Sequence, residues 1–207
     1  MAESEPADPP AGSLPGGRHR LSREQVVASQ RFRMLSAMAD AMLEKGYAGT
    51  PVAEIIRRAG VSRETFYQQF HSKQDCFIQA LDAAAEVLSG LLGSPTAPGR
   101  APQERFRGLL RTYLHTLADR PALARLFLVE AHAAGPEAME RRREVQSRFA
   151  DSVAEVFGVS SGPQRFACEA LVAATAQLVT ARLVAEDLEG LRALEDPLVT
   201  LAVQLLV

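Results

Sequence analysis

Apolar residues recur at steps of three and four along most of this chain, and that spacing is the strongest constraint on its fold. Such residues share one face of an α-helix, because a helix turns once in about 3.6 residues. The alternation typical of half-buried β-strands does not occur. The sequence therefore predicts an all-α protein. In the first helix, expected from Ser22 to Gly46, the stripe is formed by Phe32, Leu35, Met38, Ala39 and Met42.

Proline, glycine and small polar residues divide this pattern into separate helices. Thr50, Ser62 and Ser72 each precede a helical stretch, and we expect their hydroxyls to cap it by accepting a bond from a free amide. Gly60 supplies the left-handed backbone that ends a helix. The Pro- and Gly-rich stretch 93–102 predicts an interior loop. The later helices are expected at about 52–58, 63–70, 72–92, 103–118, 121–134, 136–157, 163–188 and 191–207.

The first 20 residues are rich in Pro, Gly, Ala and Ser, which predicts a flexible tail. Its end, Arg18-His19-Arg20, could touch a phosphate backbone, although a solvated tail is the favoured interpretation. The N-terminus has acids and prolines where a signal peptide has a basic start and an apolar segment. The terminal run LAVQLLV is far shorter than the ~20 residues that span a bilayer. We expect a cytoplasmic protein without a membrane segment.

The formal net charge of -2 hides an asymmetry along the chain. Residues 18–73 hold 10 Lys+Arg against 5 Asp+Glu, a balance of +5, whereas residues 74–207 hold 13 against 17, a balance of -4. Binding to nucleic acid requires only local positive charge. A small basic nucleic-acid-binding domain joined to an acidic domain fits this distribution, and chance clustering of arginine is the alternative.

No combination of residues predicts catalysis, a cofactor or a metal site. Cys76 and Cys168 lie in apolar helical sequence without CxxC spacing, so we expect buried free thiols. His115 and His132 are separated by a helix break and have no ligand partner at helical spacing. Isolated polar groups of the C-terminal half could instead belong to an apolar pocket. These are Tyr113, His115, Arg125, Glu130, His132 and Gln177.

The run Arg141-Arg142-Arg143 also suggests nucleic-acid binding at first sight. Glu137, Glu140 and Glu144 interleave with it at the spacing of helical ion pairs. We therefore expect a solvated helix face along this run.

Residues 52–70 have the parts of a helix-turn-helix, a motif whose second helix can lie in the major groove of DNA. In this second helix Phe66 and Phe70 share one face and should point into a three-helix core. Glu64 and Gln68 lie on the opposite face, and Thr65 and Tyr67 flank them. The outward face of the helix is thus predicted to be polar.

The polar residues of this helix suit two tasks. Gln68 can pair with an adenine edge, Arg63 with guanine, and Thr65 with a base or a thymine methyl group. Glu64 could accept a bond from a cytosine amine or could be a simple exposed acid. A second group suits phosphates, through a hydroxyl, a cation or helix-start amides. It comprises Thr50, Ser62, Tyr67, His71 and Lys73.

The stretch GYAGTPVAEIIRRAGVSRETFYQQFHSKQDCF, residues 46–77, resembles the DNA-binding domain of the TetR family of transcriptional regulators. The resemblance implies a helix-turn-helix domain at 21–71 and a helical ligand-binding and dimerisation domain at 72–207. It also implies a homodimer that binds a palindromic operator, usually as a repressor, and releases it when a small molecule binds. By matched motif, the phosphate contacts are Thr50, Tyr67 and Lys73, and the base-facing positions are Arg63, Glu64, Thr65 and Gln68.

Two residues depart from the family pattern. Ile56 stands where alanine is frequent, and Glu64 stands where a small or basic residue is frequent. The first departure could alter how closely the two short helices cross.

The last two expected helices suggest where two subunits meet. Residues 163–188 carry alanines at helical spacing, which permit close approach of another helix, and residues 191–207 are mostly apolar. We expect two helices of each subunit to form a four-helix interface, with ordinary internal core as the alternative. Two other functions remain open: an all-α enzyme or small-molecule carrier that does not bind DNA, and an activator of the same family.

Overall fold

The computed structural model describes residues 22–93 and 99–207, and in these ranges every regular element is a helix. The expected tail, residues 1–20, lies outside them, as does half of the expected interior loop, residues 94–98. The helices are α1 (Arg23–Lys45), α2 (Val52–Ala59), α3 (Arg63–Gln69), α4 (Lys73–Leu92), α5 (Pro102–Asp119), α6 (Pro121–Leu128), α7 (Pro136–Phe157), α8 (Gly162–Val184), α9 (Leu188–Arg192) and α10 (Glu195–Leu206).

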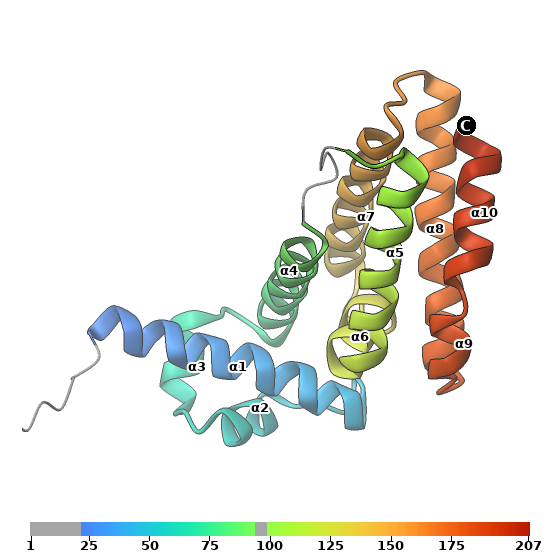
Figure 1. The fold of residues 1–207 in the computed structure, drawn as a ribbon. Coiled ribbons are helices and arrows are strands. Elements are labelled where there is room, and N and C mark those ends of the chain that lie inside the picture. The colour runs from blue at the N-terminus through green and yellow to red at the C-terminus, as the bar shows by residue number, and fades with distance from the viewer. Residues whose placement is uncertain (1–21, 94–98) are drawn as a thin grey trace, which may run out of the picture.

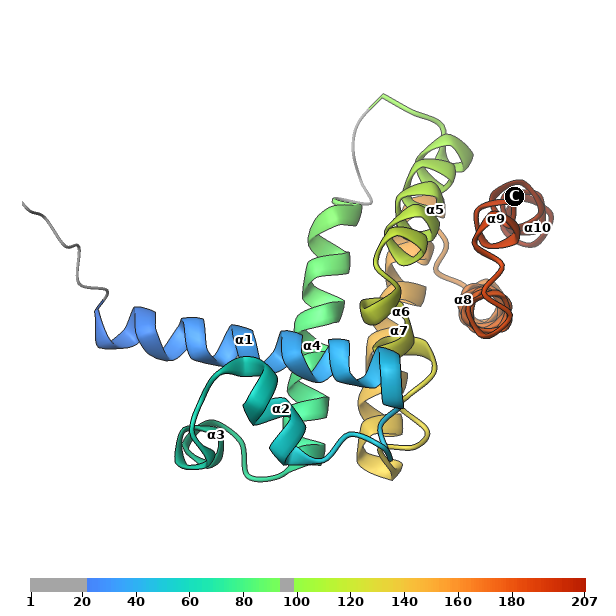
Figure 2. The same cartoon turned by 90° about the horizontal axis from the view of Figure 1, so that it is seen from below.

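The helices form two groups that meet along α4 and α6. In Figure 1, α1, α2 and α3 lie together at one end, and α4 rises from them beside the bundle of α5 to α10. α1 packs against α2 and against both α4 and α6. On the far side, α8 and α10 lie next to each other, as Figure 2 also shows. The α1–α3 group is therefore in direct contact with the larger helical bundle.

The predicted helix boundaries are largely confirmed, but three of the expected helices are wrong. The stretch expected as one helix at 121–134 ends at Leu128 and continues as turns, and the stretch expected at 163–188 ends at Val184. The stretch expected as one helix at 191–207 is divided into α9 and α10, and α9 already begins at Leu188. Ser22, Ser62 and Ser72 cap α1, α3 and α4. Gly60 has φ 62° and ψ 45°, the left-handed conformation expected for it.

The prediction that Thr50 caps α2 is wrong. Pro51 holds the cap position and provides no side-chain bond. The Thr50 hydroxyl instead donates to the Gly46 carbonyl oxygen at 2.7 Å, and Thr50 is fully buried. The hydroxyl thus satisfies a carbonyl at the end of α1, one of the groups that a helix C-terminus leaves free.

The α1–α3 core confirms the inward orientation of Phe66 and Phe70, whose exposed fractions are 0% and 1%. Their rings pack 5.3 Å apart, in the same cluster as Met34 and Met38 of α1. Phe32, however, was expected in this core and is 73% exposed. It lies two residues before Met34, about 200° around the helix. The stripe that is buried consists of Met34, Ala37, Met38, Ala41 and Met42.

α8 carries an unusually exposed apolar surface. Among the described residues it is the one helix long and apolar enough to cross a membrane by length and composition, and 28% of that stretch is buried. The expectation of no membrane segment rested on the terminal run LAVQLLV and is not supported for α8 by length and composition. Phe166, Leu178 and Val184 are 69%, 42% and 62% exposed. This face of α8 is not covered within the subunit.

We predict that Phe66→Ala lowers the free energy of unfolding by about 3–5 kcal/mol, because it removes a fully buried ring and leaves a cavity. Phe32→Ala is the matched control and should change it by less than about 0.5 kcal/mol, since that ring is exposed. Urea denaturation followed by circular dichroism measures both variants. Equal effects of the two substitutions would contradict the assigned core.

Candidate DNA-binding surface and ligand cavity

α3 is fixed at its N-terminal end and from behind. The Ser62 hydroxyl accepts a hydrogen bond from the Thr65 amide at 3.0 Å, and the Ser62 and Thr65 hydroxyls lie 2.9 Å apart. The turn before α3 is tied to α1, because Arg33 donates to the Ala59 carbonyl oxygen at 2.6 Å. With Phe66 buried beneath it, the helix has one orientation relative to α1 and α2.

The opposite face of α3 is polar and exposed. Arg63, Glu64 and Gln68 are exposed, and Tyr67 is 45% exposed. The Arg63 guanidinium lies 5.5 Å from the centre of the Tyr67 ring, and the Gln68 amide donates to Glu64 at 3.3 Å. Thr65 is half-buried at the edge of this face. These contacts are among exposed side chains, so all four groups remain accessible to a partner.

The residues expected to contact phosphates differ in exposure. His71 is exposed just beyond α3, and its amide donates to Asp75 at 2.7 Å. Lys73 is half-buried, and its ammonium donates to the Tyr47 carbonyl oxygen at 2.9 Å and lies 4.0 Å from the Tyr47 ring centre. Burial lowers the pKa of Lys73. Thr50 is fully buried, so its side chain belongs to the turn and not to the exposed surface.

The two arginines that precede the turn, Arg57 and Arg58, are used inside the domain. Both donate to Glu54, and Arg58 also pairs with Glu44 of α1 at 2.5 Å. Hydrogen bonds from Arg57, Arg58 and Lys45 lower the pKa of Glu54. Much of the local positive charge counted in the sequence is therefore neutralised by acids that join α1 to α2.

Glu130 connects the bundle to the turn between α1 and α2. It follows α6 and is 6% exposed, and its carboxylate accepts a hydrogen bond from the Tyr47 amide at 2.7 Å. Arg125 lies 3.5 Å from the other carboxylate oxygen. On its other side the same turn is held by Lys73 at the start of α4. A movement of α6 relative to α4 would therefore act directly on the turn that leads into α2 and α3.

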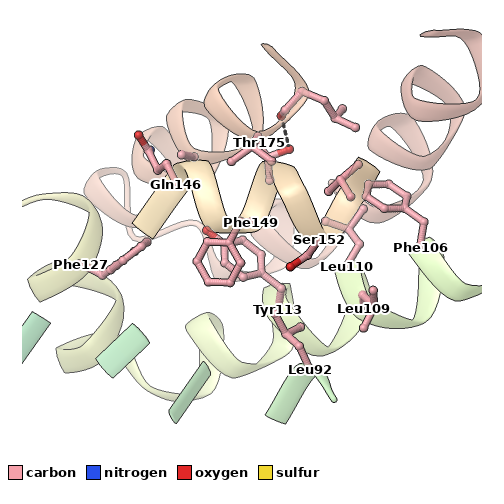
Figure 3. Close-up of a pocket in the computed structure, with 14 residues that line it drawn as sticks. Leu92, Phe106, Leu109, Leu110, Tyr113, Phe127, Gln146, Phe149, Ser152 and Thr175 are labelled. Atoms are coloured by element: carbon pink, nitrogen blue, oxygen red, sulfur yellow. Dashed lines mark hydrogen bonds between the residues drawn. The ribbon is translucent and has the colours of Figure 1, made fainter. Parts of the chain in front are cut away.

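A cavity of about 90 Å³ lies between α5, α7 and α8, with the ends of α4 and α6 at its edge. Figure 3 shows Gln146 and Phe127 toward one end and Phe106 toward the other. The wall is almost entirely apolar. Its polar side chains are Tyr113, Gln146, Ser152 and Thr175, and the Thr175 hydroxyl already donates to the Leu171 carbonyl oxygen at 2.7 Å. Burial raises the pKa of Tyr113.

The sequence named one polar residue of this cavity, Tyr113, and missed the other three. Gln177 is exposed on α8, and His115 and His132 are exposed as well. Gln146, Ser152 and Thr175 carried no motif, and only their positions on the inward faces of α7 and α8 assign them to the wall. Within residues 22–93 and 99–207 no group of His, Cys, Asp and Glu side chains could hold a metal ion.

Both cysteines are buried free thiols, as predicted. Burial, with a smaller contribution from Asp75, raises the pKa of Cys76 to about 12. Burial also raises the pKa of Cys168. Neither thiol lies at the proposed surface of α3 or among the residues that line the cavity.

Residues 35–80 match the family described as bacterial regulatory proteins, tetR family. This region, from α1 into α4, is similar to the TetR family. The chain is 31% identical over 124 residues to the transcriptional regulator RutR of Escherichia coli K12, a match that covers 57% of this chain and 55% of RutR. It is 23% identical over 178 residues to the transcriptional activator FasR of Mycolicibacterium smegmatis, covering 86% of this chain and 78% of FasR. The chain thus matches about half the length of RutR.

Solved structures of TetR-like regulators share the complete fold. FadR of Bacillus halodurans superposes with a TM-score of 0.71 at 20% identity, over 83% of this chain and 96% of FadR. FadR of Bacillus subtilis, solved with stearoyl-CoA, gives 0.71 at 18% identity, over 83% and 97%. A TetR regulator from Haloarcula marismortui gives 0.72 at 21%, over 87% and 100%. The likeness confirms the predicted order of a helix-turn-helix domain followed by a helical domain.

We predict that Glu130→Gln lowers the free energy of unfolding by about 1–3 kcal/mol, because a neutral amide replaces a buried carboxylate that accepts from the Tyr47 amide. Glu137→Gln, on the exposed first turn of α7, is the matched control and should have little effect. Urea denaturation measures both. A loss no larger for Glu130→Gln than for Glu137→Gln would show that the bond does not hold the turn.

Proposed function

We propose that this chain is a transcriptional repressor that binds a palindromic operator as a homodimer and is released from it by a small molecule. One observation carries the proposal. The exposed side of α3 presents Arg63, Glu64, Tyr67 and Gln68 together, and the opposite side is anchored by two buried phenylalanines. A helix held in this way can enter the major groove without losing its packing.

In this proposal, α3 supplies the groups that read bases. Arg63 is suited to guanine and Gln68 to adenine, with Thr65 at the edge of the helix and Glu64 beside Gln68. Tyr67, His71 and Lys73 are proposed to contact phosphates, with Ser62 near them at the start of α3. We leave Thr50 out of the proposed contacts because its side chain is buried. Its role is to hold the turn before α2.

The uncovered face of α8 supports dimerisation. Phe166, Leu178 and Val184 are exposed along this helix, with small alanines between them, and Leu205 of α10 is 44% exposed. An apolar face of this kind is stabilised by burial against a second apolar surface. A second copy of the chain would form a symmetric four-helix interface with α8 and α10. Two α3 helices related by that symmetry would require a palindromic operator.

The cavity supports release by a ligand. It touches the ends of α4 and α6, and these two helices hold the turn at Tyr47 through Lys73 and Glu130. A ligand that displaced α4 or α6 would change the position of α2 and α3, and thus the spacing of the two reading helices. A solved FadR structure with stearoyl-CoA shows that one TetR-like regulator binds a small molecule. The protein would act in the cytoplasm, without catalysis and without a resident cofactor.

Activation is the second candidate function, because the chain resembles a protein named as an activator, FasR, over 86% of its length. Deleting the gene and measuring transcription of its neighbour separates the two. Increased transcription supports repression, and decreased transcription supports activation.

We predict that Gln68→Ala costs about 1–3 kcal/mol of binding free energy on the preferred operator and relaxes selection at one base pair. Gln103→Ala, exposed on the distant α5, is the matched control and should leave binding unchanged. Electrophoretic shifts on the promoter nearest the gene, and on its single-base variants, measure both. If both substitutions leave affinity and selectivity intact, α3 is not the reading helix.

We predict that Leu178→Glu converts the dimer to a folded monomer, because it places a charge in the proposed interface while the side chain is exposed within one subunit. Leu91→Glu, at an equally exposed leucine of α4, should remain dimeric. Light scattering coupled to gel filtration gives the mass of each. A monomeric wild-type protein at micromolar concentration would contradict the dimer.

A further inference from the structure

The three consecutive arginines of α7 do not share one environment. Arg141 pairs with Asp82 and with Glu144, each at 2.5 Å, and Arg143 pairs with Glu140. These two confirm the predicted solvated face with interleaved acids. Arg142 does not, because it is only 9% exposed. The inward side of α7 carries this residue into the bundle.

Arg142 has a buried charge without a counter-charge. Within residues 22–93 and 99–207 it makes no ion pair, and its buried Nε has no hydrogen-bond partner. Three nearby acids, Asp82, Glu140 and Glu144, are paired with Arg141 or Arg143. A guanidinium remains protonated even when buried, so its desolvation is unfavourable until an anion pairs with it. The same loss of solvent contact lowers the pKa of Arg142.

The position of Arg142 connects this charge to the cavity. Arg142, Gln146, Phe149 and Val153 follow one another at helical spacing on the same side of α7. The last three line the cavity. Tyr113 lines it from α5. Arg142 thus lies one turn of α7 before Gln146, on the same side of the helix as the residues that line the cavity.

The cavity and Arg142 together have the pattern of a site for an amphiphile. The wall is formed by leucine, phenylalanine, valine and alanine side chains, which suit a hydrocarbon or aromatic body. Arg142 offers a single cation one helical turn before Gln146, whose amide belongs to the wall. One uncommitted guanidinium balances one negative charge, and its planar fork matches a carboxylate.

We propose that the effector of this protein is an apolar monocarboxylate, with its body in the cavity and its carboxylate paired with Arg142. The inference rests on the proposed function in that it takes this cavity as the effector site. It goes further by naming the charge of the ligand and the residue that selects it.

Isothermal titration of the full chain with decanoate and with the neutral decanamide tests the proposal without DNA. The wild type should bind decanoate at least about tenfold more tightly than decanamide, since a charge-assisted pair replaces an unpaired buried charge. Arg142→Met should abolish this preference while retaining binding of decanamide, and Arg142→Lys should keep part of it. Arg143→Met, which removes an exposed arginine of the same helix, is the matched control and should keep the full preference.

Three results would overturn the assignment: no preference in the wild type, an undiminished preference in Arg142→Met, or loss of preference in Arg143→Met as well. Thermal unfolding checks that each variant folds, and Arg142→Met should melt no lower than the wild type because it removes an unpaired charge. If Arg142→Met binds neither ligand, the test rests on Arg142→Lys. A preference of this variant for decanoate supports the pairing of the carboxylate with the charge at residue 142, and equal binding of the two ligands contradicts it.

An electrophoretic shift with decanoate separates this inference from the proposed function. Selective binding of decanoate without release of DNA would support the carboxylate site and contradict ligand-responsive repression. Release of DNA by decanamide and decanoate alike would support the regulator and contradict the role of Arg142.

Discussion

Phe66 and Phe70 are buried on the inner side of α3, and this burial determines what the helix presents outward. A seven-residue helix has little stability of its own, so its packing must hold it in place. The two rings lie in one cluster with the methionines of α1, and Arg33 fixes the preceding turn. With the apolar side fixed, the polar side cannot rotate inward. The exposed group of Arg63, Tyr67 and Gln68 follows from the position of two phenylalanines.

The same core couples the small domain to the rest of the chain. α1 packs on α4 and α6 as well as on α2, so the helix-turn-helix is in direct contact with the larger bundle. Lys73 of α4 and Glu130, just after α6, hold the Tyr47 turn from two sides. The far end of α4 and the end of α6 also lie at the edge of the cavity, through Leu92 and Phe127.

The ion pairs of this protein, more than its composition, decide which charges remain unpaired. Arg57 and Arg58 of the basic segment are paired with Glu54 and Glu44, and Lys73 is half-buried. The positive charge exposed at α3 is therefore carried by Arg63 and is smaller than the sum of +5 suggests. On α7, the ion pairs leave one buried arginine without a partner acid. Two arginines are matched by acids and the one between them is buried unmatched beside an apolar cavity. Unpaired buried charge is unfavourable, which is why Arg142 is informative about a ligand.

The sequence by itself determined the all-α class, most helix boundaries and the two faces of α3, because helical periodicity and capping act between residues close in the chain. It could not place Phe32, which is apolar but lies outside the buried stripe of α1, or Thr50, whose hydroxyl turns back to Gly46. The tertiary structure alone decided that Arg142 is buried, that Glu130 reaches Tyr47, and that Gln146, Ser152 and Thr175 meet in one wall. These contacts join residues distant in the chain, and local spacing carries no information about which helices pack together.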